Sequence, residues 1–576
     1  MNSVSGTAAA TASLDDPFYY LANFRFVLDW VGTHHADLLT REERGLLATF
    51  DAFPRSSQAL LVRMVMRKGE LFRTGRLVYP EIGDTERALA PLVDAGWVEA
   101  DPELGFAELF RLLRLAELRR ALKAEIAAAG LAPGASKTAI SEALSVQEFQ
   151  AKRLSEWWSV ASEALDGERI VRLAVMPWCD RLRLMFFGNL RQDWAEFVLA
   201  ELGLQRFERV PLTPGSRAFQ RREEVDAYLA LHALRERLEQ GEPIAALMTD
   251  LPSVPEENAW LAQRRGRLAF LLGQAAERSG QQALALQLYA ESGEGAGGQV
   301  EARIRHLRLL ERLGEYRQAH ALASRAWAST VGEQERQALA RLLPRLCRRL
   351  QLAPPSREPD AAVRRLDLCL PMAGSVGVER AAAEHLSRPE APVHYVENAL
   401  IAGLFGLLCW PALFAPLPGA FFHPFHIGPA DLYRDDFVAR RREIFDACLA
   451  RLDDGSHGEA IWRVWHEKRG LASPFVYWDA LDEELLEQAL VCIPATHLRA
   501  CFERLLADLK TNRAGLPDLI QFLPDAASGE PRYRLIEVKG PGDRLQDNQG
   551  RWLAFFQAQG IEAVVCHVTW QQGGAP

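Results

Sequence analysis

The sequence lacks the cysteine spacing of a zinc ribbon or of a disulfide scaffold. Its eight cysteines are scattered and contain no C-x-x-C pair. Single cysteines of this kind are typical of proteins from reducing compartments. We therefore expect free thiols and an intracellular location.

Long hydrophobic runs and a secretory leader are also missing. The most apolar stretch, residues 399–414, is interrupted by Pro411 and is too short to cross a bilayer comfortably. It predicts a buried helix. The N-terminus has neither a basic start nor a sustained apolar core, which is typical of a disordered lead. These features favour a cytoplasmic protein without a membrane partner.

Lysine is scarce, and the net charge gives no general reason to expect nucleic-acid binding. Only seven of the 67 basic residues are lysines, and the formal charge is -9. Any binding to DNA must then depend on local basic surface. Because a compact ammonium and a planar guanidinium interact differently with a ligand, the lysine at position 539 is a candidate functional residue.

The chain is long enough for three or four domains and is mainly helical in pattern. With 576 residues and 48% hydrophobic content it can bury several separate cores. The order strand, turn, strand, helix, strand near the C-terminus predicts an α/β core there. The expected fold class is multidomain and mainly α, with a C-terminal α/β domain.

The first hundred residues combine helical patterns with a strand-like segment at 71–79, which is compatible with a winged-helix-like module. Between residues 55 and 76, six basic residues and one acid, Glu70, are interleaved with apolar residues. This composition indicates either a phosphate-facing surface or an ordinary solvated helix face. The six basic residues are Arg55, Arg63, Arg67, Lys68, Arg73 and Arg76.

Residues 107–144 show two helical patterns around a Gly/Pro/Ser turn and resemble a SAP motif, a small helical DNA-binding module. If the likeness holds, five basic residues contact the DNA backbone. They are Arg111, Arg114, Arg119, Arg120 and Lys123.

The middle of the chain contains a strand-like region followed by helical repeats. IVRLAV and LRLMFFGNL, within 170–190, predict short strands in a linker. Further on, GQQALALQLYAES and GEYRQAHALASRA are self-similar and lie about 35 residues apart, close to the tetratricopeptide period. We expect a TPR-like repeat, with a plain helical bundle as the alternative and protein partners as its ligands.

Three charged side chains lie in or beside apolar strand patterns near the C-terminus. In YRLIEVK, Glu537 and Lys539 point to one side of their strand and Val538 to the other. The turn-rich loop PDAASGEP can join this strand to LPDLIQFL as a hairpin. Asp518 can then face Glu537.

Two adjacent carboxylates repel each other unless a proton or a cation lies between them. Oxygen ligands without nearby cysteine or paired histidine favour Mg²⁺ or Mn²⁺ over zinc. Lys539 can point to the same bound group, where an ammonium orients an attacking water or stabilises a phosphate oxygen.

The segments around these residues resemble one nuclease family. PD followed by ExK resembles the PD-(D/E)XK signature, and GLPDLI, LIEVKGPGDRLQDNQ and VVCHV resemble the VRR-NUC domain of the Fanconi-associated nuclease family. HYVENALIAGLFGLLCW, VWHEKRG and VYWD are similar to further family segments. The likeness is close over about 390–570, extends loosely to the whole domain order, and points to a bacterial-type member.

The resemblance implies a set of site residues. Glu397, at the start of its helix, would bind the metal together with Asp518, Glu537 and the backbone carbonyl of Val538. Asp518, Glu537 and Lys539 would form the catalytic set.

Four further positions are read from the same resemblance. Asp543 and Gln549 match motif positions with supporting roles. Lys510 stands where animal members have an arginine that contacts a terminal phosphate. Asn548 stands where those members have a lysine, which argues against a strong 5′-phosphate pocket.

Several residues compete with these assignments. Asp518 could instead cap a turn, with Glu537 and Lys539 as a surface ion pair. Glu379 and Glu384 are alternatives to Glu397. Histidine and tryptophan pairs are expected mainly to pack, with metal binding or base stacking as the alternatives. These pairs are His34 with His35, His423 with His426, and Trp157 with Trp158.

The family resemblance implies a Mg²⁺- or Mn²⁺-dependent, structure-selective DNA nuclease that cleaves 5′ flaps and branched DNA, trims 5′ to 3′, and acts in interstrand crosslink repair near the nucleoid. The alternatives are a Holliday-junction-resolvase-like or restriction-type endonuclease, and a non-catalytic repair scaffold. Both a monomer and a dimer stay open. The expected domains are a winged-helix-like module at 1–105, a SAP-like module at 106–147, a linker with short strands at 148–218, a TPR-like repeat at 219–352 and the VRR-NUC domain at 361–576.

Overall fold

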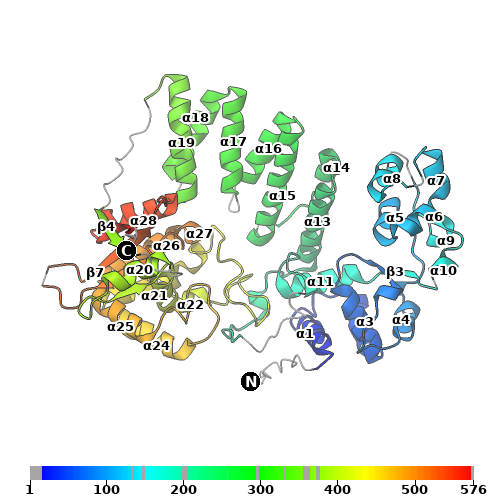
Figure 1. Ribbon diagram of the computed structural model, residues 1–576, viewed down its shortest axis with the longest axis horizontal. Helices are drawn as coiled ribbons and strands as arrows, with labels where there is room; N and C mark the ends of the chain where they lie inside the picture. The colour runs from blue at the N-terminus through cyan, green and yellow to red at the C-terminus, as the bar shows by residue number, and fades with distance from the viewer. Residues whose placement is uncertain are drawn as a thin grey trace, which may run out of the picture. The chain divides into compact units, whose positions relative to one another are not determined.

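The computed structural model describes residues 16–571 except 133, 146–148, 166, 196–204, 256, 294–297, 330–331, 354–363, 372–376 and 528. The chain divides into two compact units, Met1–Leu204 with Phe219–Val225, and Gln205–Ala218 with Asp226–Pro576. Figure 1 labels their elements. Within the described ranges, no helix is long and apolar enough to span a membrane.

The first unit contains a small antiparallel sheet and short helices. Its sheet has the order β1-β3-β2, and Phe72 of β1 pairs with Val171 of β3. The elements are α1 (Tyr19–His34), α2 (Arg41–Ala52), α3 (Arg55–Val65), β1 (Leu71–Arg73), η1 (Thr74–Arg76), α4 (Thr85–Asp94), β2 (Val98–Glu99), α5 (Phe106–Leu112), α6 (Leu115–Ala121), α7 (Lys123–Ala128), α8 (Lys137–Leu144), α9 (Leu154–Trp157), α10 (Ala161–Ala164), β3 (Ile170–Leu173) and α11 (Met176–Phe187).

Strand β3 belongs to the N-terminal sheet and not to a linker. It pairs with both β1 and β2, so helices α5 to α10 form an insertion between β2 and β3. At the base of the insertion, Leu104 and Lys152 exchange two backbone hydrogen bonds. The sequence predicted the strand correctly but assigned it to a linker, because pairing between residues 73 to 101 positions apart leaves no local signal.

Two strand predictions in this unit are wrong. The segment 71–79 is strand only over β1 and continues as the 3-10 turn η1. The second predicted strand, LRLMFFGNL, lies largely in helix α11, which ends where Gly188 adopts φ 68°. Short apolar runs fit a buried helix and a buried strand equally well, and here a left-handed glycine closes a helix.

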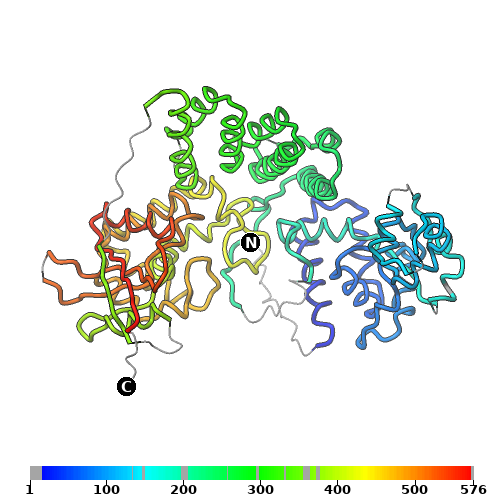
Figure 2. Tube along the Cα trace, turned by 45° about the horizontal axis from the view of Figure 1, so that its top comes forward, coloured from blue at the N-terminus to red at the C-terminus, as the bar shows by residue number. Residues whose placement is uncertain are grey.

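Helices in the second unit form the expected repeat. The self-similar pieces fall in α16 and α18, and each is preceded by a left-handed glycine, Gly280 (φ 79°) and Gly314 (φ 85°). Figure 2 shows the helices of this region, in green, side by side in a row. The helices are α13 (Arg222–Glu239), α14 (Ile244–Thr249), α15 (Ala259–Arg278), α16 (Gln282–Gly293), α17 (Val300–Leu313), α18 (Tyr316–Ser329) and α19 (Glu333–Leu350).

The C-terminal region contains a five-stranded mixed sheet with the order β4-β8-β7-β6-β5. β4, β8 and β7 run parallel, whereas β6 is antiparallel to both β7 and β5. The strands are β4 (Arg364–Leu370), β5 (Val393–Tyr395), β6 (Leu519–Phe522), β7 (Tyr533–Lys539) and β8 (Ala563–Trp570). The expected hairpin of β6 and β7 is confirmed, and helix α28 (Asp547–Ala558) connects β7 to β8.

Helices cover both faces of this sheet. Alternate residues of β7 enter different cores: Leu535 packs with the helices from α21 onward, and Ile536 packs toward α20. The remaining helices are α20 (Val378–Leu386), α21 (Leu400–Leu408), α22 (Trp410–Leu413), η3 (Ala439–Arg441), α23 (Arg442–Asp453), α24 (His457–Lys468), α25 (Glu483–Cys492), α26 (Ala495–Ala507) and α27 (Leu509–Asn512).

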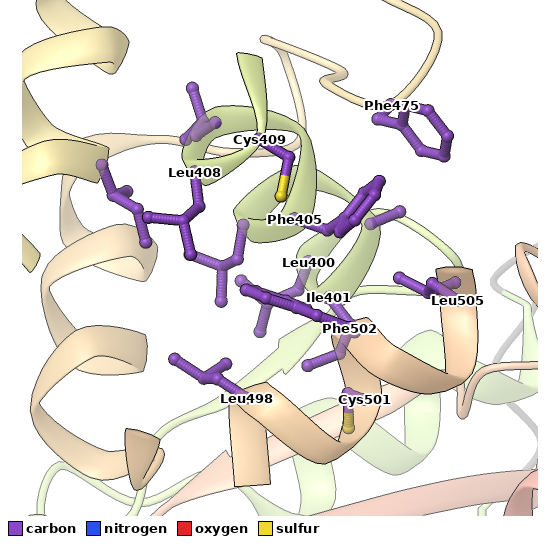
Figure 3. Packing of buried hydrophobic residues seen from close by; sticks show 14 of the residues in the cluster. Leu400, Ile401, Phe405, Leu408, Cys409, Phe475, Leu498, Cys501, Phe502 and Leu505 are labelled. Atoms are coloured by element: carbon purple, nitrogen blue, oxygen red, sulfur yellow. The ribbon is translucent and has the colours of Figure 1, made fainter. Parts of the chain in front are cut away.

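Helix α21 is the centre of the larger core. The buried helix expected at 399–414 is present as two helices, α21 and α22. All nine residues of α21 are buried. Figure 3 shows Phe405 of this helix between Phe475 and Phe502, with ring centroids 5.1 and 5.6 Å away. A Cβ on Gly406 would lie 2.8 Å from the Cβ of Phe475, so the close approach of these two segments requires glycine.

A fully buried ion pair stabilises the loop that follows α22. Asp431 and Arg441 are both inaccessible, and two nitrogens of Arg441 each donate to Asp431 over 2.9 Å. Removing the carboxylate would leave Arg441 buried without its counter-charge. Breaking such a pair costs about 3–5 kcal/mol.

We therefore expect Asp431→Ala to lower the midpoint of thermal unfolding by at least about 6 °C, measured by circular dichroism. The matched control is Asp367→Ala, whose partner Arg365 lies with it on the surface, each side chain being 64% exposed. That variant should melt close to the wild-type temperature, because exposed ion pairs contribute little to stability. Equal melting of the two variants would contradict the role of the buried pair.

Candidate active site

Asp518 and Glu537 face each other on neighbouring strands, as the sequence predicted. The pairing of Leu519 with Ile536 places Asp518, one residue earlier, opposite Glu537. The backbone N–H of Val538 donates to Oδ2 of Asp518 over 2.8 Å. Both carboxyl groups are buried, at 7% and 1% exposure. Asp518 is therefore not a turn cap on the surface.

The turn before Asp518 requires an unusual backbone. Gly515 has φ +91°, and a Cβ there would lie 2.8 Å from the side chain of Asn548 at the start of α28. Glycine therefore allows the segment that leads into β6 to approach α28 closely.

Burial and mutual repulsion hold these acids partly protonated. Burial is the main cause that raises the pKa of Asp518 to about 6, and the charge of Glu397 adds to it. Burial, followed by the charge of Asp518, raises the pKa of Glu537 to about 7. Groups in this state bind a cation readily, since the cation replaces the protons.

Lys539 supplies the positive charge in this arrangement. Its Nζ donates to Oε1 of Glu537 over 2.7 Å, and the lysine is 7% exposed. The second oxygen, Oε2 of Glu537, is buried and has no hydrogen-bond partner among the described residues. This oxygen is an unused ligand position, so the residues present fit a divalent cation. Glu537 and Lys539 are therefore not an ordinary surface ion pair.

Glu397 lies beside these groups, in the turn between β5 and α21. The helix begins at Leu400, so the expected position at the helix start is wrong by three residues. The turn is held by Asn398, which has φ 51° and accepts from the N–H of Leu516 over 3.1 Å. Asparagine tolerates this left-handed conformation better than most residues, and it ties the Glu397 turn to the Asp518 segment.

Tyr395 was not identified from the sequence. Its hydroxyl donates to Oε2 of Glu397 over 2.5 Å, and this bond is the main cause that raises the pKa of Tyr395 above its usual range. Tyr395 is the last residue of β5, and Glu397 follows two residues later in the turn. That spacing in HYVEN was the available signal.

The competing carboxylates lie on α20. The charge of Glu379 raises the pKa of Asp518, with a smaller effect than that of Glu397. Glu384 pairs with Arg380 on the surface. Across the described residues, no three His, Cys, Asp or Glu side chains lie close enough, as they stand, to hold a metal ion. Lys539 and Tyr395 instead satisfy oxygens of Glu537 and Glu397.

The supporting residues make local hydrogen bonds. Oδ2 of Asp543 accepts from the N–H of Gly540 over 3.0 Å, and Oε1 of Gln549 accepts from the N–H of Gln546 over 2.9 Å. The first bond shapes the turn after β7, and the second caps α28. Lys510 lies in α27 and is exposed.

Arg73 was wrongly predicted as a DNA contact. Its side chain is 4% exposed, and its guanidinium pairs with Glu117, over 2.7 Å, and with Glu168. Two carboxylates, from the inserted helices and from the segment before β3, satisfy it inside the first unit. Arg73 therefore holds the insertion to the sheet.

Two other predicted DNA contacts are half-buried in structural interactions. Arg63 pairs with Glu81 over 2.6 Å and lies on the ring of Tyr20. Arg119 donates to the carbonyl of Ala135 over 2.7 Å. The remaining basic residues of the set are exposed and stay predictions: Arg55, Arg67, Lys68, Arg76, Arg111, Arg114, Arg120 and Lys123.

The histidine and tryptophan pairs make packing contacts. His423 and His426 are 4.1 Å apart between ring centroids, and burial lowers the pKa of both. His34 stacks on Trp30. Trp157 and Trp158 are buried in the core of the inserted helices.

Comparison with known family models matches three segments of the chain. Three family models match: "FAN1, HTH domain" at residues 18–99, "Fanconi anemia-associated nuclease SAP domain" at 103–157 and "VRR-NUC domain" at 452–570. The last match begins after β4 and β5, although these strands complete the sheet that carries Asp518 and Glu537.

Relatives and a solved structure agree with these matches. The chain is 51% identical to a "Fanconi-associated nuclease 1 homolog" of Pseudomonas aeruginosa, over 97% of each chain. It is 34% identical to the human "Fanconi-associated nuclease 1" over 30% of this chain and 17% of that one. The structure titled "Crystal structure of paFAN1 bound to 2nt 5'flap DNA with gap" covers 98% of this chain and 100% of its own, with a TM-score of 0.80 and 51% identity.

Proposed function

The chain belongs to the Fanconi-associated nuclease family, and from this premise we propose that it cleaves 5′ flaps and branched DNA near the junction, with 5′-to-3′ trimming, in interstrand crosslink repair. It is a structure-selective DNA nuclease that depends on a divalent metal. A solved relative, 51% identical, is titled as bound to 5′-flap DNA. The observation that carries the chemistry is the buried pair of Asp518 and Glu537 beside Lys539.

The donor set supports Mg²⁺ or Mn²⁺ as the metal. We place the ion between Asp518, Glu537 and Glu397, with the carbonyl of Val538 as a fourth ligand. All four atoms are oxygens, which these hard cations prefer. The free Oε2 of Glu537 supports this choice. Tyr395 would hold Glu397 in a fixed orientation.

The residues of the chain have separate roles in hydrolysis. When bound, the cation supplies a Lewis acid that screens negative charge on the phosphate. Asp518 and Glu537 would hold it, and their strands fix their separation. Lys539 projects from the same face of β7 as Glu537, so its ammonium can orient the attacking water or donate to a phosphate oxygen.

Exposed arginines and lysines of the N-terminal and inserted helices would hold the duplex by its phosphates. Such contacts read shape more than sequence, and they weaken as salt rises. Because the net charge is -9, attraction to DNA has to come from local basic surfaces such as these, so we expect a steep salt dependence.

The test compares labelled DNA substrates at equal concentration: a 5′ flap, a 3′ flap, a four-way junction and a nicked duplex. With Mn²⁺ or Mg²⁺ we expect preferential cutting of the 5′ flap, and with excess EDTA none. Light scattering on the same preparation gives the mass of the active species.

The alternatives predict different results. Symmetric cutting of the four-way junction by a dimer would assign the chain to a resolvase-like activity and overturn the flap assignment. Tight binding to every substrate without cutting in either metal would identify a scaffold instead.

A further inference from the structure

Two exposed tyrosines in the C-terminal unit flank one arginine. Tyr433 and Tyr477 are 46% and 51% exposed. Arg513 lies 5.7 Å from the ring centroid of Tyr433, and one of its Nη atoms donates weakly to the hydroxyl of Tyr477 over 3.5 Å. We call these three residues the tyrosine–arginine surface.

Arg513 differs from those arginines of this unit that pair with carboxylates. Arg441 pairs with Asp431, and Arg504 with Glu333. Arg513 has no carboxylate partner within the described part of the chain; its other hydrogen bond goes to the carbonyl of Pro474 over 3.4 Å. The charge of this guanidinium, which also lies 5.8 Å from the ring centroid of Phe475, is therefore not neutralised by a carboxylate of that part of the chain.

Three loops converge to build this surface. A Cβ on Gly428 would lie 2.8 Å from Cγ of Pro474, so the loop that leads to Tyr433 packs on the loop that leads to Tyr477. Arg513 joins both through the same Pro474. The surface thus has a fixed base, although its two phenol rings are exposed.

The same loops connect to segments that carry active-site residues. Phe475, two residues before Tyr477, packs on Phe405 of α21 (Figure 3), and the turn before α21 carries Glu397. Arg513 precedes Asp518 by five residues, at most about 18 Å of chain. Between them, Leu516 is bound to Asn398. A strand cut at Asp518 therefore has neighbouring nucleotides within reach of the surface.

Aromatic rings beside an unpaired arginine are the chemistry of single-strand binding. Unpaired bases stack on aromatic side chains regardless of sequence, and arginine adds a cation–π contact and a phosphate contact. Duplex bases are stacked on each other and cannot use such rings. The surface therefore distinguishes an unpaired strand from a duplex, which phosphate contacts alone do not.

We propose that Tyr433, Tyr477 and Arg513 form a stacking site for the unpaired bases of the DNA strand that enters the active site. The proposal rests on the proposed flap nuclease function and names the part of the substrate that the surface recognises. Its ligand is the base of a single-stranded nucleotide, independent of sequence.

The test measures binding of two 5′-flap substrates that differ only in the flap, one with bases and one with abasic sites. Inactive Asp518→Asn protein with Ca²⁺ keeps the DNA uncut. We expect the flap with bases to bind about 10-fold more tightly or better. In a background that also carries Tyr433→Ala and Tyr477→Ala, this ratio should fall to about 1.

The conservative pair Tyr433→Phe and Tyr477→Phe is the matched control, because it keeps the rings and should keep the ratio. The ratio of the two flap affinities is measured within each protein. A general loss of folded protein affects both affinities equally and leaves the ratio unchanged. A 2-aminopurine in the flap should be quenched by the phenylalanine pair and not by the alanine pair.

An equal affinity of the parent protein for both flaps, or an unchanged ratio in the alanine pair, would overturn the stacking site. A change of oligomeric mass in the alanine pair with the ratio intact would assign the surface to a protein contact and also overturn it. Failure of the nuclease function is a separate result, since it appears as a lack of cutting by the wild-type chain.

Discussion

Asp518→Asn should reduce cleavage of a 5′ flap at least about 1000-fold, since loss of one charged ligand removes several kcal/mol of charge stabilisation. The amide is the informative choice because its oxygen can still accept from the N–H of Val538, as Asp518 does over 2.8 Å. The fold should therefore survive. Lys539→Ala should cost about 100- to 1000-fold.

The chain contains its own matched control. The tripeptide Leu-Pro-Asp occurs at 516–518 and again at 523–525 in the same hairpin. Asp518 is 7% exposed and faces Glu537, whereas Asp525 lies exposed in the hairpin loop. Asp525→Asn removes one negative charge from the same segment and should cut within about twofold of wild type.

Single-turnover cleavage with saturating enzyme measures the chemical step, and anisotropy with labelled DNA measures binding. We expect binding to change little in all three variants. If Asp518→Asn cuts as fast as Asp525→Asn, the carboxylate pair is not the metal site.

Metal binding should strengthen steeply with pH. A cation replaces the protons on Asp518 and Glu537, whose pKa values are about 6 and about 7. From about pH 5.5 to about pH 8 the fraction of protein with both groups ionised rises on the order of 100-fold, and the apparent affinity follows it. Titration calorimetry with Mn²⁺ in buffers of different ionisation enthalpy gives both the affinity and the number of protons released.

The same shifts make the metal-free protein less stable as pH rises. An acid whose pKa is raised by folding binds more protons in the native state than in the unfolded state, between about pH 4 and pH 7. The free energy of unfolding therefore falls through this range, by about 1.4 kcal/mol for each unit of pKa shift. Below pH 4 both states are protonated, and above pH 7 the loss is complete.

Glu537→Gln is the control for both measurements, because it cannot titrate. Its unfolding should depend less on pH than that of the wild type, and its Mn²⁺ affinity should be low throughout. A Mn²⁺ affinity of the wild type that does not vary over this pH range would contradict replacement of protons by the cation.

The active site could be predicted from the sequence because its signals are local. Alternation in YRLIEVK and a turn-rich loop of hairpin length define which side chains share a face, and the structure pairs β6 with β7 accordingly. That alternation places Glu537 on one face of β7 and Ile536 on the opposite face. The helix expected at 399–414 follows from a run in which nearly every residue is apolar.

Errors occur where distant partners decide the outcome. Arg73 belongs to a basic stretch, but its two carboxylates lie 44 and 95 residues further along the chain, so nothing near it in sequence predicts burial. Strand β3 likewise pairs with residues far away in the sequence, so its place in the sheet could not be predicted. The strand prediction for LRLMFFGNL was wrong for another reason. Its apolar residues fit the period of a helix and that of a strand, and only Gly188 marks the helix end.

Strands β2 and β3 have a mechanical consequence for the helices inserted between them. The paired residues Glu99 and Arg172 lie next to each other, so the insertion leaves and rejoins the sheet at one point, and the Leu104 and Lys152 bonds clamp its neck. Arg73 of β1 also pairs with Glu117 of α6, so the inserted body is attached to the sheet at a further point and cannot tumble relative to it. Its orientation toward a duplex is thus largely set before the encounter, which reduces the entropy lost on binding.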